Sequence, residues 1–260
     1  MPIIDPNTVT AILRDVAQEV ILPRFKRLAD TDIREKKPGD LVTIADTEAE
    51  AALTRRLSDL LPGCKVVGEE AVATDPSVLE NLTGDDPVWI LDPVDGTANF
   101  VKGRRLFAVI VALVVKGRTV QGWIHDPLSG RTTVAELGAG TWQDAERLRI
   151  VHKGALAAMQ GAAGYRYGDG LARAVGRLIC QGSAAHEYLG LVENRLQFAF
   201  FRRLHPWDHA AGVLLHSEAG GYSALLNGSP YRPVPSTEGI LLAPDQRSWD
   251  QLRPLVARPN

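Results

Sequence analysis

The spacing of apolar residues predicts two helices in the first quarter of the chain. Asn7 is expected to cap the first helix, and Pro23 to kink or end it. Asp46 is expected to cap the second, which stops at Pro62 and Gly63. Apolar side chains recur every three or four positions in both helices: Val9, Ile12, Leu13, Val16, Val20 and Ile21, then Ala49, Leu53, Leu57, Leu60 and Leu61. The polar segment 34–39 between them predicts an exposed turn or a mobile loop.

From residue 65 the apolar residues come in short runs, which predict strands. The runs cover 65–68, 88–91, 107–115, 119–125 and 131–137. Short connections between the last three favour antiparallel pairing. After residue 149, strands alternate with helices. The strands are expected at 157–161, 178–180, 196–201, 221–226 and 239–243, and the helices at 170–177, 184–192, 206–219 and 247–256.

These patterns predict an α+β or α/β protein in two parts. Residues 1–148 are expected to form an N-terminal subdomain around a mixed or antiparallel sheet. Residues 149–260 are expected to form a C-terminal α/β subdomain, because alternating strands and helices pack as layers.

Composition narrows the class of protein. The chain has 260 residues, 45% of them hydrophobic and 23% charged, with a formal net charge of −2. Such a balance is typical of a soluble globular protein and argues against binding to nucleic acid polymers. The longest apolar run is about half of what a membrane span requires, and no signal peptide is recognised, so we expect a cytoplasmic protein. Cys64 and Cys180 form no CxxC pair and are predicted to be buried, reduced thiols.

One turn carries the strongest chemical signal. An apolar run ends in Asp92 and Asp95, with Pro93 and Gly96 forcing a turn around them. Two such charges repel by about 4 kcal/mol at 4 Å and an effective dielectric constant of 20. The pair therefore predicts a cation, and hard oxygen ligands favour Mg²⁺, Mn²⁺ or Ca²⁺ over zinc. Asp-Pro and Asp-Gly are also common turn dipeptides, so the motif by itself leaves an ordinary turn open.

Other polar groups are ambiguous when taken singly. Glu69 and Glu70 follow a short strand and can equally be a solvated pair, and Asp208 can simply favour the start of a helix. His205 and His209 have the four-residue spacing of zinc ligands, but Pro206 places His205 before the helix, so zinc is not expected. The sequence assigns structural roles to His125 and His152, and leaves His186 and Glu187 open to either role.

Taken together, the motifs resemble the inositol monophosphatase family of Mg²⁺-dependent, lithium-sensitive phosphomonoesterases. They occur in the family's order along essentially the whole chain. They are Asp40-Leu41-Val42-Thr43 with Asp46, Gly68-Glu69-Glu70, Asp92 to Thr97, Gly182-Ser183-Ala184-Ala185, Pro206 to Gly212, and Glu218 to Gly221. The resemblance implies a layered αβαβα sugar-phosphatase-like fold, a homodimer, and two to three Mg²⁺ ions that Mn²⁺ can replace.

The resemblance also implies the metal ligands. Glu69, Asp92 and the carbonyl of Val94 would bind the first ion. Asp92, Asp95 and Asp208 would hold the second. Glu70 would take part around a third, weaker site.

The catalytic and flap residues follow from the same resemblance. Thr97, aligned by Asp46, would help Glu69 to deprotonate the attacking water. The backbone amides of Gly96 and Thr97 would hold the phosphate. Lys36 and Lys37 match a mobile flap of the family, although two lysines beside Pro-Gly are also typical of a polar turn.

The chain departs from the inositol-specific members where substrate is bound. The residues expected to contact substrate are Asp95, Gly96, Thr97, Gly182, Ser183, Ala184, Phe201, Arg202 and Asp208. Phe201 stands where those enzymes carry a glutamate that binds sugar hydroxyls, and Arg202 and Arg203 follow it. The segment 161–170 also lacks their Ser/Thr-rich stretch.

Guanidinium groups favour phosphate or carboxylate, so we expect a more anionic or differently shaped ester than inositol 1-phosphate. A sugar bisphosphate, a nucleotide 3′-phosphate or histidinol phosphate would fit; alternatively, the two arginines merely decorate an exposed strand end. The prediction is therefore a metal-dependent phosphomonoesterase for a small phosphorylated metabolite. The alternative is a non-catalytic relative that binds a phosphorylated ligand or a partner as a scaffold.

Overall fold

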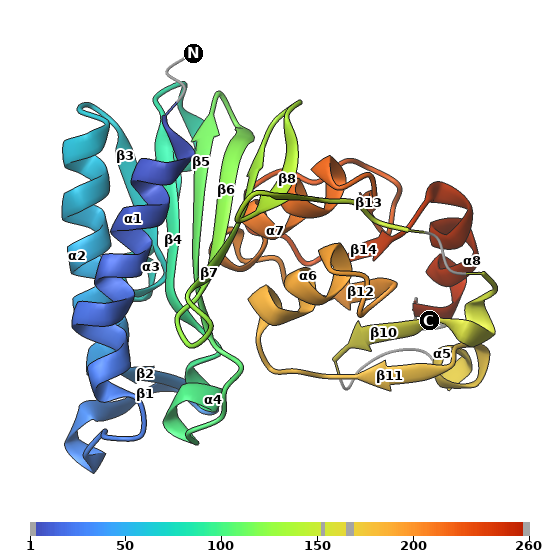
Figure 1. Cartoon of the computed structure of the whole chain (residues 1–260), viewed down its shortest axis with the longest axis horizontal. Coiled ribbons are helices and arrows are strands. Elements are labelled where there is room, and N and C mark those ends of the chain that lie inside the picture. The colour runs from blue at the N-terminus through green and yellow to red at the C-terminus, as the bar shows by residue number, and fades with distance from the viewer. Residues whose placement is uncertain (1–3, 152–153, 165–168, 257–260) are drawn as a thin grey trace.

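The computed structural model describes residues 4–151, 154–164 and 169–256. They form layers in the order helix, sheet, helix, sheet, helix (Figure 1). The predicted αβαβα architecture is therefore confirmed. Among the described residues, no helix combines the length and apolar character needed to cross a membrane.

The N-terminal half is built on a seven-stranded sheet, ordered β3-β4-β5-β6-β7-β8-β9. Its strands are β3 (Lys65–Gly68), β4 (Val88–Asp95), β5 (Ala108–Val115), β6 (Arg118–Asp126), β7 (Arg131–Glu136), β8 (Gly140–Gln143) and β9 (Glu146–Leu148). Only β3 and β4 pair in parallel, and the other neighbours are antiparallel. The expected mixed sheet is confirmed, with two more strands at its edge than the sequence predicted.

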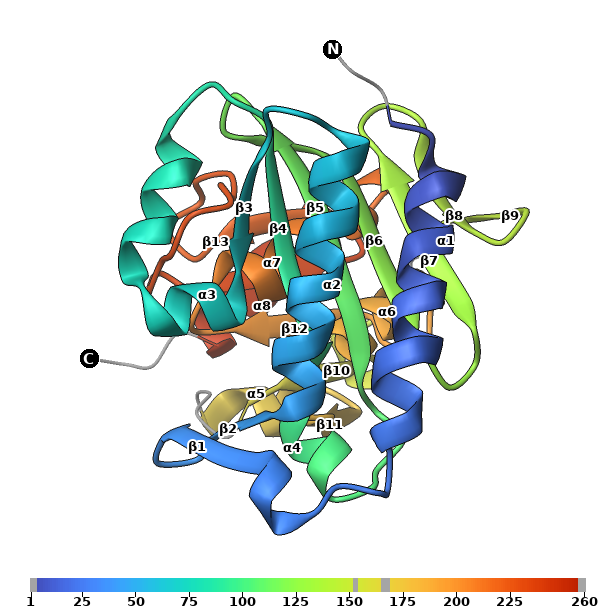
Figure 2. The same ribbon diagram turned by 90° about the vertical axis from the view of Figure 1, so that its left-hand side faces the viewer.

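Helices cover both faces of this sheet, and β4 is therefore buried at every position. α1 (Pro6–Val16) and α2 (Ile44–Leu60) lie across one face (Figure 2). Their apolar sides pack on Trp89, Leu91 and Trp123 in one hydrophobic cluster. Burial on both faces explains the continuous apolar run before Asp92.

The second sheet has five strands, ordered β11-β10-β12-β14-β13. Its strands are β10 (Gln160–Ala163), β11 (Arg177–Ile179), β12 (Phe198–Phe201), β13 (Tyr222–Leu225) and β14 (Ile240–Ala243). α6 (Ala184–Val192) and α7 (Pro206–Glu218) fill the layer between the sheets (Figure 1). α5 (Asp169–Ala174) and α8 (Gln246–Val256) close the far side. The middle layer therefore brings the start of α7 up to the first sheet.

Short elements complete the chain. They are the hairpin of β1 (Ile33–Lys37) and β2 (Asp40–Thr43), the helices α3 (Glu69–Thr74) and α4 (Thr97–Val101), the π-helix Ala17–Ile21, and the 3₁₀ helices Leu22–Arg24, Asp30–Asp32, Pro76–Thr83 and Leu156–Ala158. Segment 34–39 is thus mostly β-hairpin rather than the loop expected, because only Pro38 and Gly39 form the turn, with Gly39 at φ 84°.

Both predicted helix caps were wrong by a few residues. Asp5 caps α1, because its carboxylate accepts a hydrogen bond from the Asn7 amide at 3.0 Å. Thr43 caps α2, and Asp46 reaches back from the first turn to the Thr43 amide at 2.8 Å. The cap shifts to the residue whose extended backbone lets its side chain face the open amides.

The prediction of two buried thiols was also wrong. Cys64 is half-buried and Cys180 is exposed. Cys180 lies just after β11, at the edge of the second sheet, where no neighbouring strand covers it.

Candidate active site

Three carboxylates converge where β4 meets α7. Oxygens of Asp92, Asp95 and Asp208 lie within 4.8 Å of one another. Asp92 and Asp95 are buried, with 2% and 6% of their surfaces exposed. Burial, and then repulsion by neighbouring carboxylates, raises the pKa of Asp92 and of Asp208 well above the ordinary value. A buried group of like charges at this spacing suits a divalent cation, and all-oxygen donors suit Mg²⁺ or Mn²⁺.

The parallel pairing of β3 with β4 brings Glu69 to the same end of the sheet. Gly68 lies opposite Leu91 in the register, so each strand delivers its acidic residue at the next position. Glu69 and Glu70 begin α3. Repulsion by Glu69 adds to burial at Glu70 and raises the pKa of its carboxyl to about 7.

The hairpin supplies a cation to this glutamate pair. Lys36 Nζ lies 2.7 Å from Glu69 Oε1 and 3.0 Å from Glu70 Oε1. Burial disfavours the charge on Lys36, but the two carboxylates outweigh it and raise the lysine pKa above its ordinary value. Lys37 is exposed, so of the two flap lysines only Lys36 is brought to the glutamates.

The hydrogen bond expected between Thr97 and Asp46 is present. Thr97 Oγ1 lies 3.0 Å from Asp46 Oδ1 and 3.0 Å from the carbonyl oxygen of Val94. The other oxygen of Asp46 accepts from the amide and hydroxyl of Thr43, at the start of α2. Burial raises the pKa of Asp46 to about 6. Thr97 is thus held at the first residue of α4, directly after the turn at Gly96.

Gly96 is required by the close packing of this turn. It adopts φ +87°, and a Cβ there would lie 2.8 Å from the carbonyl oxygen of Leu106. Any other residue would be strained by the positive φ angle and by the contact between its Cβ and this oxygen.

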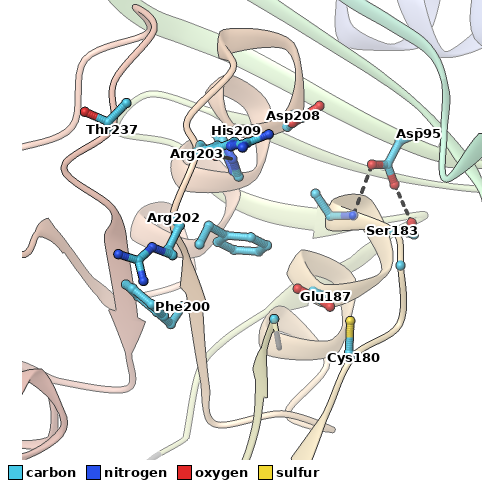
Figure 3. A pocket seen from close by; sticks show the side chains of 14 residues that line it. Asp95, Cys180, Ser183, Glu187, Phe200, Arg202, Arg203, Asp208, His209 and Thr237 are labelled. Carbon is cyan, nitrogen blue, oxygen red and sulfur yellow. Dashed lines mark hydrogen bonds between the residues drawn. The ribbon is translucent and has the colours of Figure 1, made fainter. Parts of the chain in front are cut away.

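Asp95 joins the two halves of the molecule. Its carboxylate accepts hydrogen bonds from the amides of Ala184 and Ala185, at 3.0 Å each, and from the hydroxyl of Ser183 (Figure 3). These groups form the start of α6, so Asp95 caps that helix. Gly182, just before it, adopts φ +67° and accepts a hydrogen bond from Asn99 at 3.1 Å.

The comparisons with known proteins agree with this geometry. The model of the inositol monophosphatase family matches residues 5–258. The chain belongs to the inositol monophosphatase family. An inositol-1-monophosphatase of Rhizobium meliloti is 30% identical over 249 residues, or 90% of each chain. A fructose-1,6-bisphosphatase/inositol-1-monophosphatase of Thermotoga maritima is 31% identical over 72% of this chain and 73% of its own.

The chain is also similar to proteins with a different name and to proteins of solved structure. A Nus factor SuhB of Pasteurella multocida is 30% identical over 82% of both chains. The solved Thermotoga maritima IMPase superposes with a TM-score of 0.83 and 26% identity, covering 96% of this chain and 95% of its own. Membership of the inositol monophosphatase family supports a phosphatase.

Beside the carboxylates opens a cavity of about 850 Å³ (Figure 3). Phe201 lines it and stacks on Tyr188, with ring centroids 5.2 Å apart. Arg202 and Arg203 line the same cavity. Segment 161–170 stands where inositol-specific relatives carry their Ser/Thr-rich stretch; its residues 165–168, like His152, lie outside the described residues.

His209 helps to build this cavity wall instead of offering a metal ligand. Its Nδ1 lies 3.0 Å from the Tyr188 hydroxyl and its Nε2 lies 2.9 Å from the carbonyl oxygen of Arg203. Burial lowers the pKa of His209 to about 4, so the ring is neutral and both nitrogens are used. His205 stacks on Trp207. Neither histidine forms part of the carboxylate group.

Sequence reasoning missed Glu50. This buried carboxylate accepts hydrogen bonds from the backbone amides of Glu70 and Ala71, at 2.8 Å each, and so caps α3. A Cβ on Gly68 would lie 2.3 Å from its carboxyl carbon, so glycine is needed there. The signal was available: Glu50 follows Asp46 by four residues and therefore shares its helix face.

Proposed function

We propose that the protein is a metal-dependent phosphomonoesterase that hydrolyses a small phosphorylated metabolite by attack of water. The observation that carries this proposal is the convergence of Asp92, Asp95 and Asp208 within 4.8 Å. Two buried carboxylates and a half-buried third would be costly without a cation, and the donor set fits a hard divalent ion.

The ions would be Mg²⁺, with Mn²⁺ as a substitute, and their ligands follow from the family. Glu69, Asp92 and the Val94 carbonyl would hold one ion, and Asp92, Asp95 and Asp208 a second. Glu70 would stand near a third. When bound, the ions lower the pKa of the attacking water and neutralise charge on the phosphate and the leaving oxygen.

The chain's own groups would place the reactants. The Thr97 hydroxyl donates a hydrogen bond to Asp46 at 3.0 Å. This contact would orient the hydroxyl toward the reacting water. Glu69 would accept the proton of this water. The amides of Gly96 and Thr97 would donate to phosphate oxygens. Lys36 balances the charge of the glutamates through its ion pairs.

The substrate would be an ester that carries a second anionic group. Phe201 offers an aromatic ring where inositol-specific relatives bind hydroxyls, and Arg202 and Arg203 line the same cavity. Guanidinium groups pair with phosphate or carboxylate. A bisphosphate, a nucleotide 3′-phosphate or a similar ester would satisfy this arrangement better than inositol 1-phosphate; a panel in which inositol 1-phosphate has the highest kcat/KM would contradict this choice.

Phosphate release with and without Mg²⁺ tests the central proposal. We expect EDTA to abolish release and Mg²⁺ to restore it, and Asp208→Asn to lower kcat by at least about 100-fold. Asp126→Asn is the matched control, because Asp126 supports only the turn after β6 through the Leu128 and Ser129 amides. Full activity in EDTA, or of Asp208→Asn, would contradict a metal-dependent mechanism.

A second candidate function is a scaffold that binds a phosphorylated ligand or a partner without catalysis. The relatives named Nus factor SuhB favour this alternative. Binding of phosphate esters with no release of phosphate in Mg²⁺ or Mn²⁺ would support it. Homodimerisation, a cytoplasmic location and the division into subdomains 1–148 and 149–260 stay predictions.

A further inference from the structure

Glu187 is a buried acid that the proposed chemistry does not use. It lies in the first turn of α6 and lines the cavity beside Asp95 and Asp208 (Figure 3). Only 6% of the residue is exposed. Among the described residues, one hydrogen bond reaches its carboxylate, from the Gln181 amide to Oε1 at 3.1 Å.

Within the described residues, Glu187 has no cation of the kind that usually accompanies a buried carboxylate. Burial, together with repulsion from Asp95, raises its pKa to about 7, and the Gln181 amide only partly opposes this. The ion pairs found among the described residues do not include it. A buried acid with one hydrogen bond weakens a fold, so its place on a cavity wall points to a ligand.

The residues on the other side of the cavity indicate which chemical group of a ligand would bind to Glu187. Arg202 extends from the end of β12, on a different side of the cavity from Glu187 (Figure 3). Phe201 lines the same cavity, stacks on Tyr188 and contacts His209, so it presents a ring and no hydrogen-bond acceptor. A hydroxyl in this cavity therefore has Glu187 as its carboxylate acceptor on α6, in place of an acceptor at position 201.

We propose that Glu187 is a specificity residue that accepts a hydrogen bond from a hydroxyl of the leaving alcohol. A hydroxyl of the leaving alcohol would then lie at α6 while the phosphate lies at the carboxylate group. This assignment rests on the proposed phosphatase function and deepens it. Arg202 and Arg203 would serve a second anionic group on the other side.

Two esters with the same six-carbon chain separate recognition from chemistry. Sorbitol 6-phosphate carries hydroxyls, whereas hexyl phosphate has none. We expect Glu187→Gln to raise KM for sorbitol 6-phosphate about tenfold, because a neutral amide accepts a hydrogen bond less strongly than a carboxylate. Its kcat/KM for hexyl phosphate should stay within about twofold. Glu187→Leu, which has no acceptor, should give a larger loss on sorbitol 6-phosphate only.

Glu193→Gln is the matched control, because Glu193 lies at the other end of α6 and pairs with Arg195. It should leave both esters unchanged. Thermal melting checks folding, and Glu187→Gln should melt no lower than wild type, since it removes a buried ionisable group. An equal loss on both esters, or no change with either variant, would overturn the role of Glu187.

Calorimetry keeps this test independent of turnover. If wild type hydrolyses neither ester, the Kd for sorbitol 6-phosphate still reports on Glu187, while phosphate release in Mg²⁺ from the esters with a second anionic group decides the phosphatase proposal separately. We expect that Kd to rise about tenfold in Glu187→Gln, with the Kd for hexyl phosphate unchanged. Equal Kd values for sorbitol 6-phosphate in wild type and Glu187→Gln would overturn the inference.

Discussion

At the scale of single residues, a few hydrogen bonds define what each carboxylate can do. Asp46, Asp95 and Glu50 are all buried acids, but each has backbone amides as partners. Asp92 instead has one backbone donor, the amide of Val94 at 3.1 Å, and it faces other carboxylates. Such amide partners give Asp46 and Glu50 a structural role, whereas Asp92 is suited to a cation. Asp95 has both characters, because it caps α6 and also belongs to the carboxylate group.

Substitution of Thr97 tests the role of a single hydroxyl group in the site. Thr97→Val keeps the shape of the side chain but removes the hydroxyl held by Asp46 and Val94. We expect kcat to fall about 100-fold or more, as for loss of a group that positions a proton transfer. Thr97→Ser, which retains the hydroxyl, should keep most of the activity. Steady-state kinetics with saturating Mg²⁺ measures both, and a Thr97→Val enzyme of wild-type kcat would refute the proposed role.

His125 gives a residue-scale prediction for pH. Burial lowers its pKa from 6.5 to about 4, so the folded protein keeps it neutral. Below pH 6.5 the unfolded chain takes up the proton first, and the stability that neutral His125 contributes is lost as the pH falls toward 4. Wild type should lose about 1.4 kcal/mol per pH unit in that window relative to His125→Gln, which does not titrate.

Denaturant unfolding at pH 7.5, 6.0 and 5.0 measures this difference. Other buried acids and histidines titrate in both proteins and cancel between them. The glutamine can still bond to Thr132, the partner of His125 at 2.9 Å. A stability difference that stays constant from pH 7.5 to 5.0 would show that His125 is not held neutral.

At the scale of elements, the candidate site is formed largely at the N-terminal ends of helices. α2, α3, α6 and α7 all begin beside it, and acidic side chains from other elements cap two of them. Glu50 on α2 caps α3, and Asp95 on β4 caps α6. Strand and helix positions are thereby coupled across the chain. Periodicity predicted α2 and α6, but it missed α3 and the hairpin. These short polar segments contact Glu50 and Glu69, which are distant from them in sequence or on another element.

Glu50→Gln tests the coupling between α2 and α3. The amide retains one acceptor oxygen, so one of the two bonds to the Glu70 and Ala71 amides is lost. Because Glu69 begins the same helix, we expect the Mg²⁺ concentration for half-maximal activity to rise about tenfold, with kcat at saturation nearly unchanged. Glu48→Gln, on the exposed side of α2, is the control. A lower melting temperature without any change in Mg²⁺ dependence would assign Glu50 a purely structural role.

At the scale of the whole molecule, the site lies where two sheets and the middle helix layer meet. One hydrophobic cluster includes residues of both sheets, such as Ile110 and Leu242, together with Leu215 of α7. This shared packing fixes Asp208 against Asp92 and Asp95, so the carboxylate group is a property of the assembled fold.

Metal binding should therefore stabilise the whole molecule. The carboxylate group exists only in the folded state, so Mg²⁺ at 100 times its Kd should add about 2.7 kcal/mol to the free energy of unfolding. The melting temperature of wild type should rise with Mg²⁺ concentration, whereas that of Asp208→Asn should rise much less. Equal shifts in both proteins would place the stabilising ions elsewhere.

The sequence by itself determined the family, most helices and strands, and the carboxylates expected to bind metal, because these depend on local spacing and on side-chain chemistry. Only the tertiary structure decided which amide donates a hydrogen bond to each carboxylate and which cation forms an ion pair with it. Asp95 and Ser183 are 88 residues apart in sequence, and Lys36 and Glu69 are 33 apart. Burial and charge pairing at such separations arise only when the layers pack. Local patterns therefore named Lys36 and Glu187 as candidates, but they could not show that Lys36 meets Glu69, that Glu50 caps α3 or that Glu187 lines the cavity.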